Sequence, residues 1–141
     1  MTSKKTELTV SAKINAPVEK VWNVWTSPEH IMNWNFASDD WYCPLSENDL
    51  RVDGKFRATM AAKDGSFAFD FEGVYTVVDL HKTISYVMPD GGKVEITFVS
   101  EGNATRVTEV FDAETENSPE MQLQGWQMIL NNFKNYTESL F

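Results

Sequence analysis

The sequence is short of the features that mark several classes of protein. Its 141 residues include one cysteine, Cys43, which cannot form a disulfide within the chain and fits a reducing compartment. Only 12 lysines and arginines stand against 21 aspartates and glutamates, and the net charge of −9 disfavours nucleic acid and anionic membranes as partners. No apolar run approaches the roughly 20 residues that cross a bilayer, and none follows the first lysines as in a secretory signal. We therefore expect a cytoplasmic protein.

Motifs of metal sites and of common catalytic sites are also missing. The two histidines, His30 and His81, are far apart, and no histidines or cysteines have the spacing of metal ligands. There is no glycine-rich phosphate loop and no Gly-x-Ser-x-Gly nucleophile motif. We expect neither a metal nor a cofactor. Cys43, in the stretch WYCP, is more typical of a small buried hydrophobic residue than of a nucleophile.

The chain has enough apolar residues for one hydrophobic core. Hydrophobic residues make up 42% of the sequence and aromatic residues 13%, with nine phenylalanines and five tryptophans. The length suits one domain that can bury a substantial core. No repeat, linker or low-complexity tract divides the chain, so a single domain over residues 1–141 is expected.

The predicted elements are one strand, two short helices, six strands and one long helix. Alternation in ELTVSAKIN predicts the first strand, and helical spacing in VEKVWNVW and the start signal Ser27-Pro28-Glu29 predict the short helices. Turn signals, among them Asp53-Gly54 and Asp64-Gly65, separate six antiparallel strands. These strands are expected at about 47–52, 55–62, 67–78, 84–88, 93–100 and 105–112. A helix that starts at Ser118-Pro119-Glu120 can run to about Ser139.

This order predicts an α+β fold. A curved antiparallel sheet of about seven strands and one long helix hide each other's apolar faces when the sheet wraps around the helix. A two-residue turn at Asp64-Gly65 would fix the register of one hairpin. The pairs expected on its inner face are Met60 with Phe69, Ala58 with Phe71, and Phe56 with Gly73. Arg57 and Glu72 would pair on the outer face.

The orientation of Glu109 depends on one turn. A two-residue turn at Gly102-Asn103 pairs Ile96 with Glu109 and points the carboxylate into the apolar face. A loop longer by one residue would turn Glu109 outward and Thr108 and Val110 inward. Both registers stay open at this stage, and the need to bury Val107 and Phe111 favours the first. An inward Glu109 would have a raised pKa and could anchor a hydroxyl or an amine, or act as a general acid or base.

Gly125 lies inside the long helix, immediately before Trp126. Glycine there costs roughly 1 kcal/mol relative to alanine. One interpretation is close packing of the helix against the two short helices. The other is a cavity beneath the first half of the helix, with Trp126 as one wall. The glycine alone does not decide between them.

Five stretches together resemble a known superfamily. They are NAPVEKVWNVWTSPEHIMNW, LRVDGKF, FDFEGVY, TRVTEVFD and GWQMILNNFKNY. Their order and spacing resemble those of the SRPBCC or START-related superfamily, and most closely the branch named for the activator of the 90-kDa heat-shock protein ATPase. The resemblance covers nearly the whole chain and implies a helix-grip fold that holds a small apolar or amphipathic ligand between sheet and long helix. The co-chaperones that named the branch have an additional N-terminal domain that engages the chaperone, and we expect no counterpart of it here.

Pattern and resemblance together predict a cytosolic binding protein for a small hydrophobic or amphipathic molecule. A second hypothesis is an enzyme similar to the cyclases or hydrolases of the superfamily, with Glu109 as its acid or base. A third is an interaction partner of a chaperone. The candidate ligand-binding residues are Trp34, Trp41, Phe56, Met60, Phe69, Phe71, Ile96, Phe98, Glu109, Gln122, Trp126 and Ile129.

Overall fold

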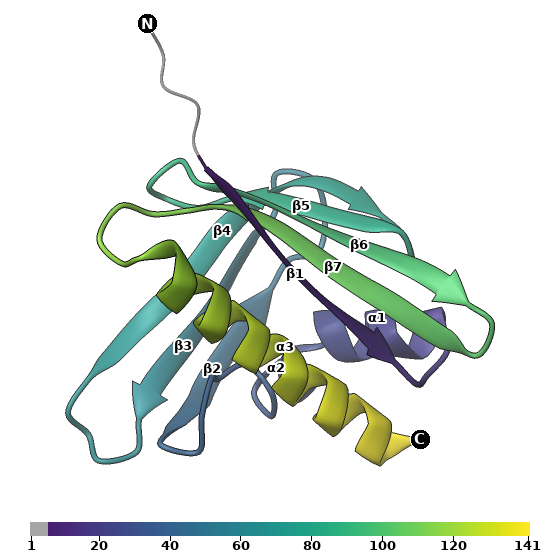
Figure 1. The fold of residues 1–141 in the computed structure, drawn as a ribbon, viewed down its shortest axis with the longest axis horizontal. Coiled ribbons are helices and arrows are strands. Elements are labelled where there is room, and N and C mark those ends of the chain that lie inside the picture. The colour runs from purple at the N-terminus through teal and green to yellow at the C-terminus, as the bar shows by residue number, and fades with distance from the viewer. Residues whose placement is uncertain (1–5) are drawn as a thin grey trace, which may run out of the picture.

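A seven-stranded antiparallel sheet curls around one long helix in the computed structural model, which describes residues 6–141 (Figure 1). The strands are β1 (Glu7–Ile14), β2 (Trp41–Asn48), β3 (Lys55–Ala62), β4 (Ala68–Asp79), β5 (Thr83–Val87), β6 (Lys93–Glu101) and β7 (Ala104–Asp112). The helices are α1 (Val18–Thr26), α2 (Pro28–Ile31) and α3 (Pro119–Leu140). The strand order is β1-β7-β6-β5-β4-β3-β2, so β1 lies beside β7 and the other strands follow each other as a meander. This confirms the predicted α+β helix-grip fold.

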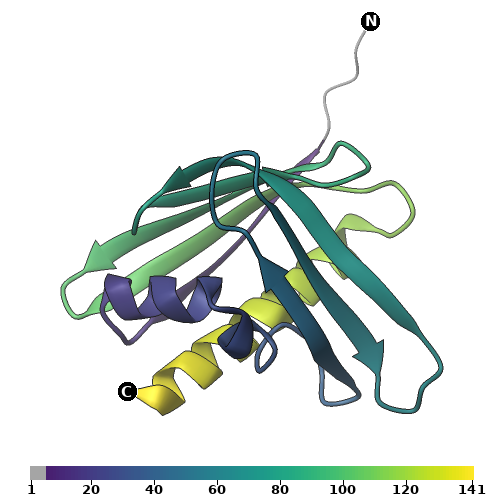
Figure 2. The same cartoon turned by 180° about the vertical axis from the view of Figure 1, so that it is seen from behind.

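The helices lie on the concave side of the sheet (Figure 2). Ser118 caps α3, because its hydroxyl accepts a hydrogen bond from the backbone N–H of Met121 at 3.2 Å. Pro119 occupies the first turn of the helix, where a backbone N–H would have no partner within the helix. The long helix therefore begins where the sequence predicts. None of the helices within residues 6–141 is long and apolar enough to cross a membrane. The first lysines, on which the secretory-signal prediction depends, fall in residues 1–5, outside the described residues.

The β3–β4 hairpin has the predicted register. Met60 pairs with Phe69, Ala58 with Phe71, Phe56 with Gly73 and Arg57 with Glu72. The Arg57 guanidinium makes its ion pairs with Glu47 at 3.3 Å and Asp70 at 3.9 Å, rather than with the directly opposite Glu72. Phe69 is 42% exposed although it is on the inner face, because it lies near an open end of the sheet. The turn therefore predicted the face of each residue, while exposure depends on position along the strand.

The strand predicted at about 47–52 is wrong, because β2 spans Trp41–Asn48. Asp53-Gly54 does not form a two-residue turn. Asp53 has a φ of +69°, and its N–H donates to the Tyr75 carbonyl, so this segment already runs beside β4. Pro44 made this strand hard to recognise in the sequence. Proline is tolerated here because β2 lies at the edge of the sheet and its register shifts between Tyr42 and Leu45.

The β6–β7 hairpin resolves the orientation of Glu109. Gly102 has a φ of +69° in the turn, Glu101 pairs with Ala104, and Ile96 pairs with Glu109. The carboxylate therefore points to the concave side, and the longer-loop alternative is wrong. Thr108 and Val110 are only half-buried, whereas Val107 and Phe111 are fully buried.

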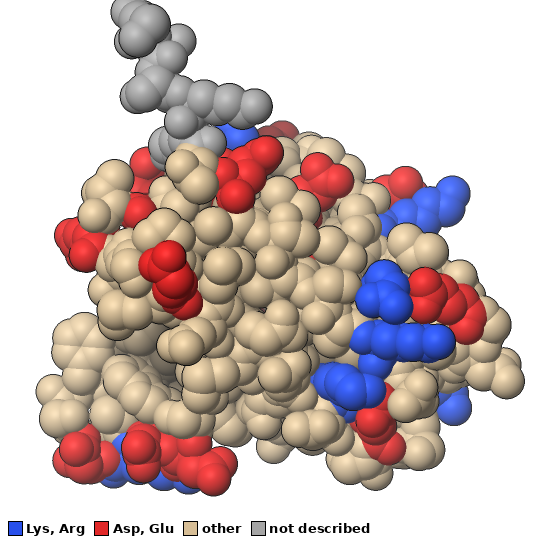
Figure 3. Space-filling model, in the orientation of Figure 1, with Lys and Arg blue, Asp and Glu red and all other residues tan. Residues whose placement is uncertain are grey.

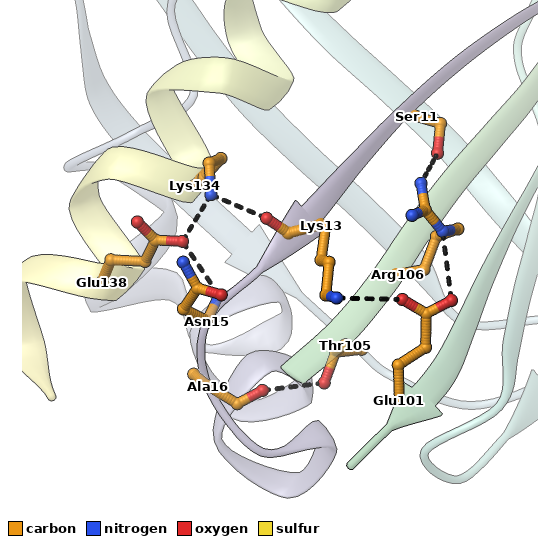
Figure 4. A network of polar contacts seen from close by, with 9 residues as sticks. All are labelled: Ser11, Lys13, Asn15, Ala16, Glu101, Thr105, Arg106, Lys134 and Glu138. Atoms are coloured by element: carbon orange, nitrogen blue, oxygen red, sulfur yellow. Dashed lines mark hydrogen bonds and ion pairs between the residues drawn. The ribbon is translucent and has the colours of Figure 1, made fainter. Parts of the chain in front are cut away.

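The second half of α3 is attached to β1 by polar contacts (Figure 4). Lys134 Nζ donates to the Lys13 carbonyl at 2.7 Å and pairs with Glu138, whose carboxylate accepts from the Asn15 backbone N–H at 2.8 Å. Beneath these contacts the apolar side chains of Leu130 and Phe133 are fully buried. The closed part of the core therefore lies under the C-terminal half of α3, and any internal space has to lie under its N-terminal half.

Candidate functional site

An open pocket of about 450 Å³ lies between the sheet and the N-terminal half of α3. Its wall is formed mainly by inner-face residues of β2 to β7, by the segment 34–38 after α2, and by one side of α3. Trp25 of α1, Ile31 of α2 and the ion pair of Glu47 with Arg57 complete the wall. Small-molecule sites in proteins commonly have volumes of about 300–1,000 Å³. The pocket is therefore large enough for a small organic molecule.

Most of the residues predicted to bind a ligand line this pocket. They are Trp34, Trp41, Phe56, Met60, Phe69, Phe71, Ile96, Glu109, Gln122, Trp126 and Ile129. Phe98, which was expected to border the cavity, does not line this pocket. Its ring packs against Trp22 at 5.2 Å and Trp25 at 5.9 Å between centroids, which makes it part of the core beside α1. That the other residues bind a ligand stays a prediction.

The aromatic walls are held in place by packing. The Trp126 ring stacks on Phe111 with 3.9 Å between centroids and an angle of 9°, and meets Phe71 edge-on at 6.0 Å. Trp34 packs against Phe133 at 4.9 Å, and its indole N–H donates to the Val24 carbonyl at 3.1 Å. These contacts leave the indole of Trp34 as an apolar surface toward the pocket, because its only polar atom is already bonded.

Gly125 faces open space. Apart from the backbone of α3 and the two chain neighbours of Gly125, no atom lies within 4 Å of the position that a Cβ would take. Gly125 also lines the pocket. Close packing against the short helices would place atoms at that position. The open space contradicts close packing of the short helices against Gly125, and that the space is a ligand cavity stays a prediction.

Glu109 is the carboxylate at the inner end of the pocket. It lies on β7 between Val10 of β1 and Ile96 of β6, and only 6% of it is exposed. No hydrogen bond joins its carboxylate to another of residues 6–141. Burial raises its pKa to about 8, since a charge in apolar surroundings is unfavourable. Its carboxylate is thus without a hydrogen-bond partner among the described residues, in a pocket whose walls are mostly apolar.

Tyr86 is the second polar group of this inner wall, and it was not among the predicted residues. Burial and then the negative charge of Glu109 raise the pKa of its phenol. The sheet register brings Tyr86 close to Glu109. Tyr86 pairs with Val94 and Glu109 pairs with Ile96, and Val94 and Ile96 are neighbouring inner-face residues of β6. The strand prediction at about 84–88 included Tyr86, but no turn in that stretch defined its face.

Two further polar residues of the wall are engaged in the fold. Gln122 accepts from the Glu114 N–H at 2.9 Å and donates to the carbonyls of Glu114 and Asn117, so it holds the loop before α3 and has little capacity left to anchor a ligand. The hydroxyl of Tyr75 donates to Asn48, whose amide donates to the Thr26 carbonyl at 2.7 Å. Tyr75 was also missed, although alternation from Phe71 through Gly73 places it on the inner face.

Other candidate groups play no part in the pocket. Cys43 is buried, as its sequence context predicts, and its thiol donates to the Leu45 carbonyl at 3.3 Å. Within the described part of the chain, no three histidine, cysteine, aspartate or glutamate residues cluster closely enough to hold a metal ion. The chemistry of the site therefore rests on Glu109, Tyr86 and the aromatic walls.

Comparison with known proteins gives consistent matches. A family model described as Activator of Hsp90 ATPase homolog 1-like protein matches residues 15–138. The solution structure of an AHSA1-like protein from Aeromonas hydrophila is 46% identical, with a TM-score of 0.90 over 96% of this chain and 94% of that one. A solution structure of a protein from Cytophaga hutchinsonii is 48% identical, with a TM-score of 0.82 over 95% and 93% of the two chains. A crystal structure of a protein from Nitrosomonas europaea, 21% identical with a TM-score of 0.81 over 96% of each chain, shares the fold. No curated protein matched.

Proposed function

The chain belongs to the family of Activator of Hsp90 ATPase homolog 1-like proteins, as the resemblance predicted, and we propose that it is a binding protein for a small hydrophobic or amphipathic molecule. The ligand occupies the pocket between the sheet and α3. The free, buried Cys43 supports a place in the cytoplasm, where thiols stay reduced.

The observation that carries this proposal is the open space at Gly125. A helix residue beside a sheet normally contributes to a close-packed core, and a void there forfeits packing energy. Here the helix has no side chain at the position that would fill the pocket, although glycine also weakens the helix. Both costs are expected where space is kept for a ligand.

The test uses N-phenylnaphthylamine, an uncharged fluorescent apolar probe. We expect it to bind the purified protein with a stoichiometry near one. Gly125→Leu adds a side chain that projects into the pocket and should abolish probe binding. Gln124→Leu adds a similar apolar side chain to an exposed position one residue earlier and should leave binding unchanged.

Thermal unfolding of both variants shows that they are folded under the assay conditions, since overpacking can cost about 1–3 kcal/mol. Absence of probe binding to the unmodified protein would contradict the proposal. Equal binding by a folded Gly125→Leu variant would show that the probe binds elsewhere.

A catalytic function is the second candidate, and Glu109 is the observation that favours it. A general acid or base works best when its pKa lies near the working pH, and burial raises the pKa of Glu109 to about 8. If a molecule copurifies with the protein, mass spectrometry can follow whether it is converted over time. Conversion that is lost in Glu109→Gln while the molecule still binds would support catalysis.

A further inference from the structure

We propose that the pocket takes a lipophilic amine, a molecule with an apolar body and one ammonium group, and that the Glu109 carboxylate pairs with this ammonium. The inference rests on the proposed function and adds the chemical class of its ligand. Four features of the molecule support it: the missing partner of Glu109, the aromatic rings beside it, the acidic surroundings of the pocket, and the ion pairs of Arg57, the basic side chain of the pocket, with Glu47 and Asp70.

The charges that line the pocket are Glu109, Glu47 and Arg57. Glu47 lies exposed on the edge strand β2, Arg57 lies half-exposed on the neighbouring strand β3, and the two pair with each other at 3.3 Å. Of the described pocket residues, the inner wall thus contains a carboxylate but no basic side chain. A buried charge without a partner is costly, and a cation brought by the ligand would supply the partner that the protein lacks.

Aromatic rings form a continuous surface next to this carboxylate. Tyr86 packs against Phe56 at 4.6 Å and Phe71 at 6.2 Å between centroids, and Phe71 in turn contacts Trp126 at 6.0 Å. Faces of tryptophan, tyrosine and phenylalanine attract ammonium groups, most strongly when water is excluded. The same rings provide the apolar contact that the body of the ligand needs. One wall therefore suits both parts of a lipophilic amine.

The surroundings of the pocket also favour a cation. Trp41 and Phe69 line the pocket at the sheet end where the exposed Asp39, Asp40 and Asp64 lie. Acidic side chains gather over the ends of β2 to β4, at the lower left of Figure 3, with a few basic groups among them. With a net charge of −9, the whole molecule attracts cationic ligands and repels anionic ones such as fatty acids.

Affinity for the cation should depend on pH in a defined direction. The groups packed around Glu109 are Val10 from β1, Ile96 from β6 and Tyr86 from β5, and of these only Tyr86 titrates. Because burial raises the pKa of Glu109 to about 8, the carboxyl is mostly neutral at neutral pH in the free protein. A permanently charged ligand binds the carboxylate form. Its affinity should therefore rise roughly tenfold per pH unit below about pH 8 and level off above it.

The experiment compares phenylbutyl-trimethylammonium with its uncharged isostere, in which a tert-butyl group replaces trimethylammonium. The two differ in charge and hardly in shape, and the cation does not titrate. Binding is measured by quenching of tryptophan fluorescence from about pH 6 to about pH 9. The unmodified protein should prefer the cation at the upper end of this range. In Glu109→Gln, affinity for the cation at about pH 9 should fall by roughly 30-fold or more and lose its pH dependence, while affinity for the isostere should change less than about threefold.

Glu95→Gln is the matched control, because it removes one carboxylate from an exposed position of β6. It should leave the preference for the cation and its pH dependence intact. If the isostere binds and the cation binds no more tightly, or if Glu109→Gln binds the cation as the unmodified protein does, the inference is overturned while the proposed function stands. If neither compound nor N-phenylnaphthylamine binds, the proposed function itself fails.

Discussion

At the scale of single residues, Glu109 should make the stability of the fold depend on pH. The ordinary pKa of the carboxyl, 4.5, describes the unfolded chain, and burial raises the pKa in the folded protein to about 8. Between these values the folded protein holds a proton that the unfolded chain releases, so the free energy of unfolding falls as the pH rises through this window. Below about pH 4.5 both states are protonated and the effect disappears.

We therefore expect Glu109→Gln to be more stable than the unmodified protein, by about 4 kcal/mol at about pH 8 and by little at about pH 4.5. Urea unfolding at both pH values measures the difference. Glu95→Gln, with its carboxylate exposed, should not show this pH-dependent gain. A free energy of unfolding for Glu109→Gln that parallels the unmodified protein at both pH values would mean that the carboxylate is better solvated than its burial indicates.

Gly125 allows a second test at this scale. Because a Cβ there meets no neighbouring atom and the backbone is helical, Gly125→Ala should stabilise the protein by about 0.5–1 kcal/mol. Gly102→Ala should have the opposite effect, since Gly102 has a φ of +69°, a conformation that a side chain disfavours. Urea unfolding of the two variants measures both changes. Destabilisation by Gly125→Ala would mean that the space beneath the helix is filled.

At the scale of elements, α3 has two halves with different support. The second half has buried side chains beneath it and the contacts of Lys134 and Glu138 beside it, whereas the first half spans the pocket. Amides of residues 130–137 should therefore exchange with solvent more slowly than those of residues 123–127. Saturating N-phenylnaphthylamine should slow exchange in the first half only. Hydrogen exchange followed by NMR gives the rates; uniform protection along α3, unchanged by the probe, would contradict this description.

The success of the predictions also varies by element. The β3–β4 and β6–β7 registers could be predicted because each hairpin has a tight turn with glycine at a positive φ, Gly65 and Gly102. Where a loop or a bulge intervenes, the inference failed. The Asp53-Gly54 segment is part of a longer loop between β2 and β3 rather than a two-residue turn. A register shift between Tyr75 and Val77 separates the Tyr75–Tyr86 pair from the turn that joins β4 to β5.

At the scale of the whole molecule, the sheet and α3 enclose one interior, which is packed under the second half of α3 and holds the pocket under the first half. The overall order of elements was predictable from periodicity and turn residues, and so was most of the pocket wall, because alternation in the strands points the aromatic side chains to one face. That Phe98 lies outside the wall could not be inferred, since it depends on how α1 packs Trp22 and Trp25 over that end of the sheet.

The space under the first half of α3 is proposed to receive a ligand. NMR titration of isotope-labelled protein with N-phenylnaphthylamine tests this proposal most directly. We expect saturation at one probe per chain, with intermolecular nuclear Overhauser effects from the probe to Gly125, Trp126 and Phe71. Contacts of the probe with surface residues alone, or no saturable contacts, would contradict it.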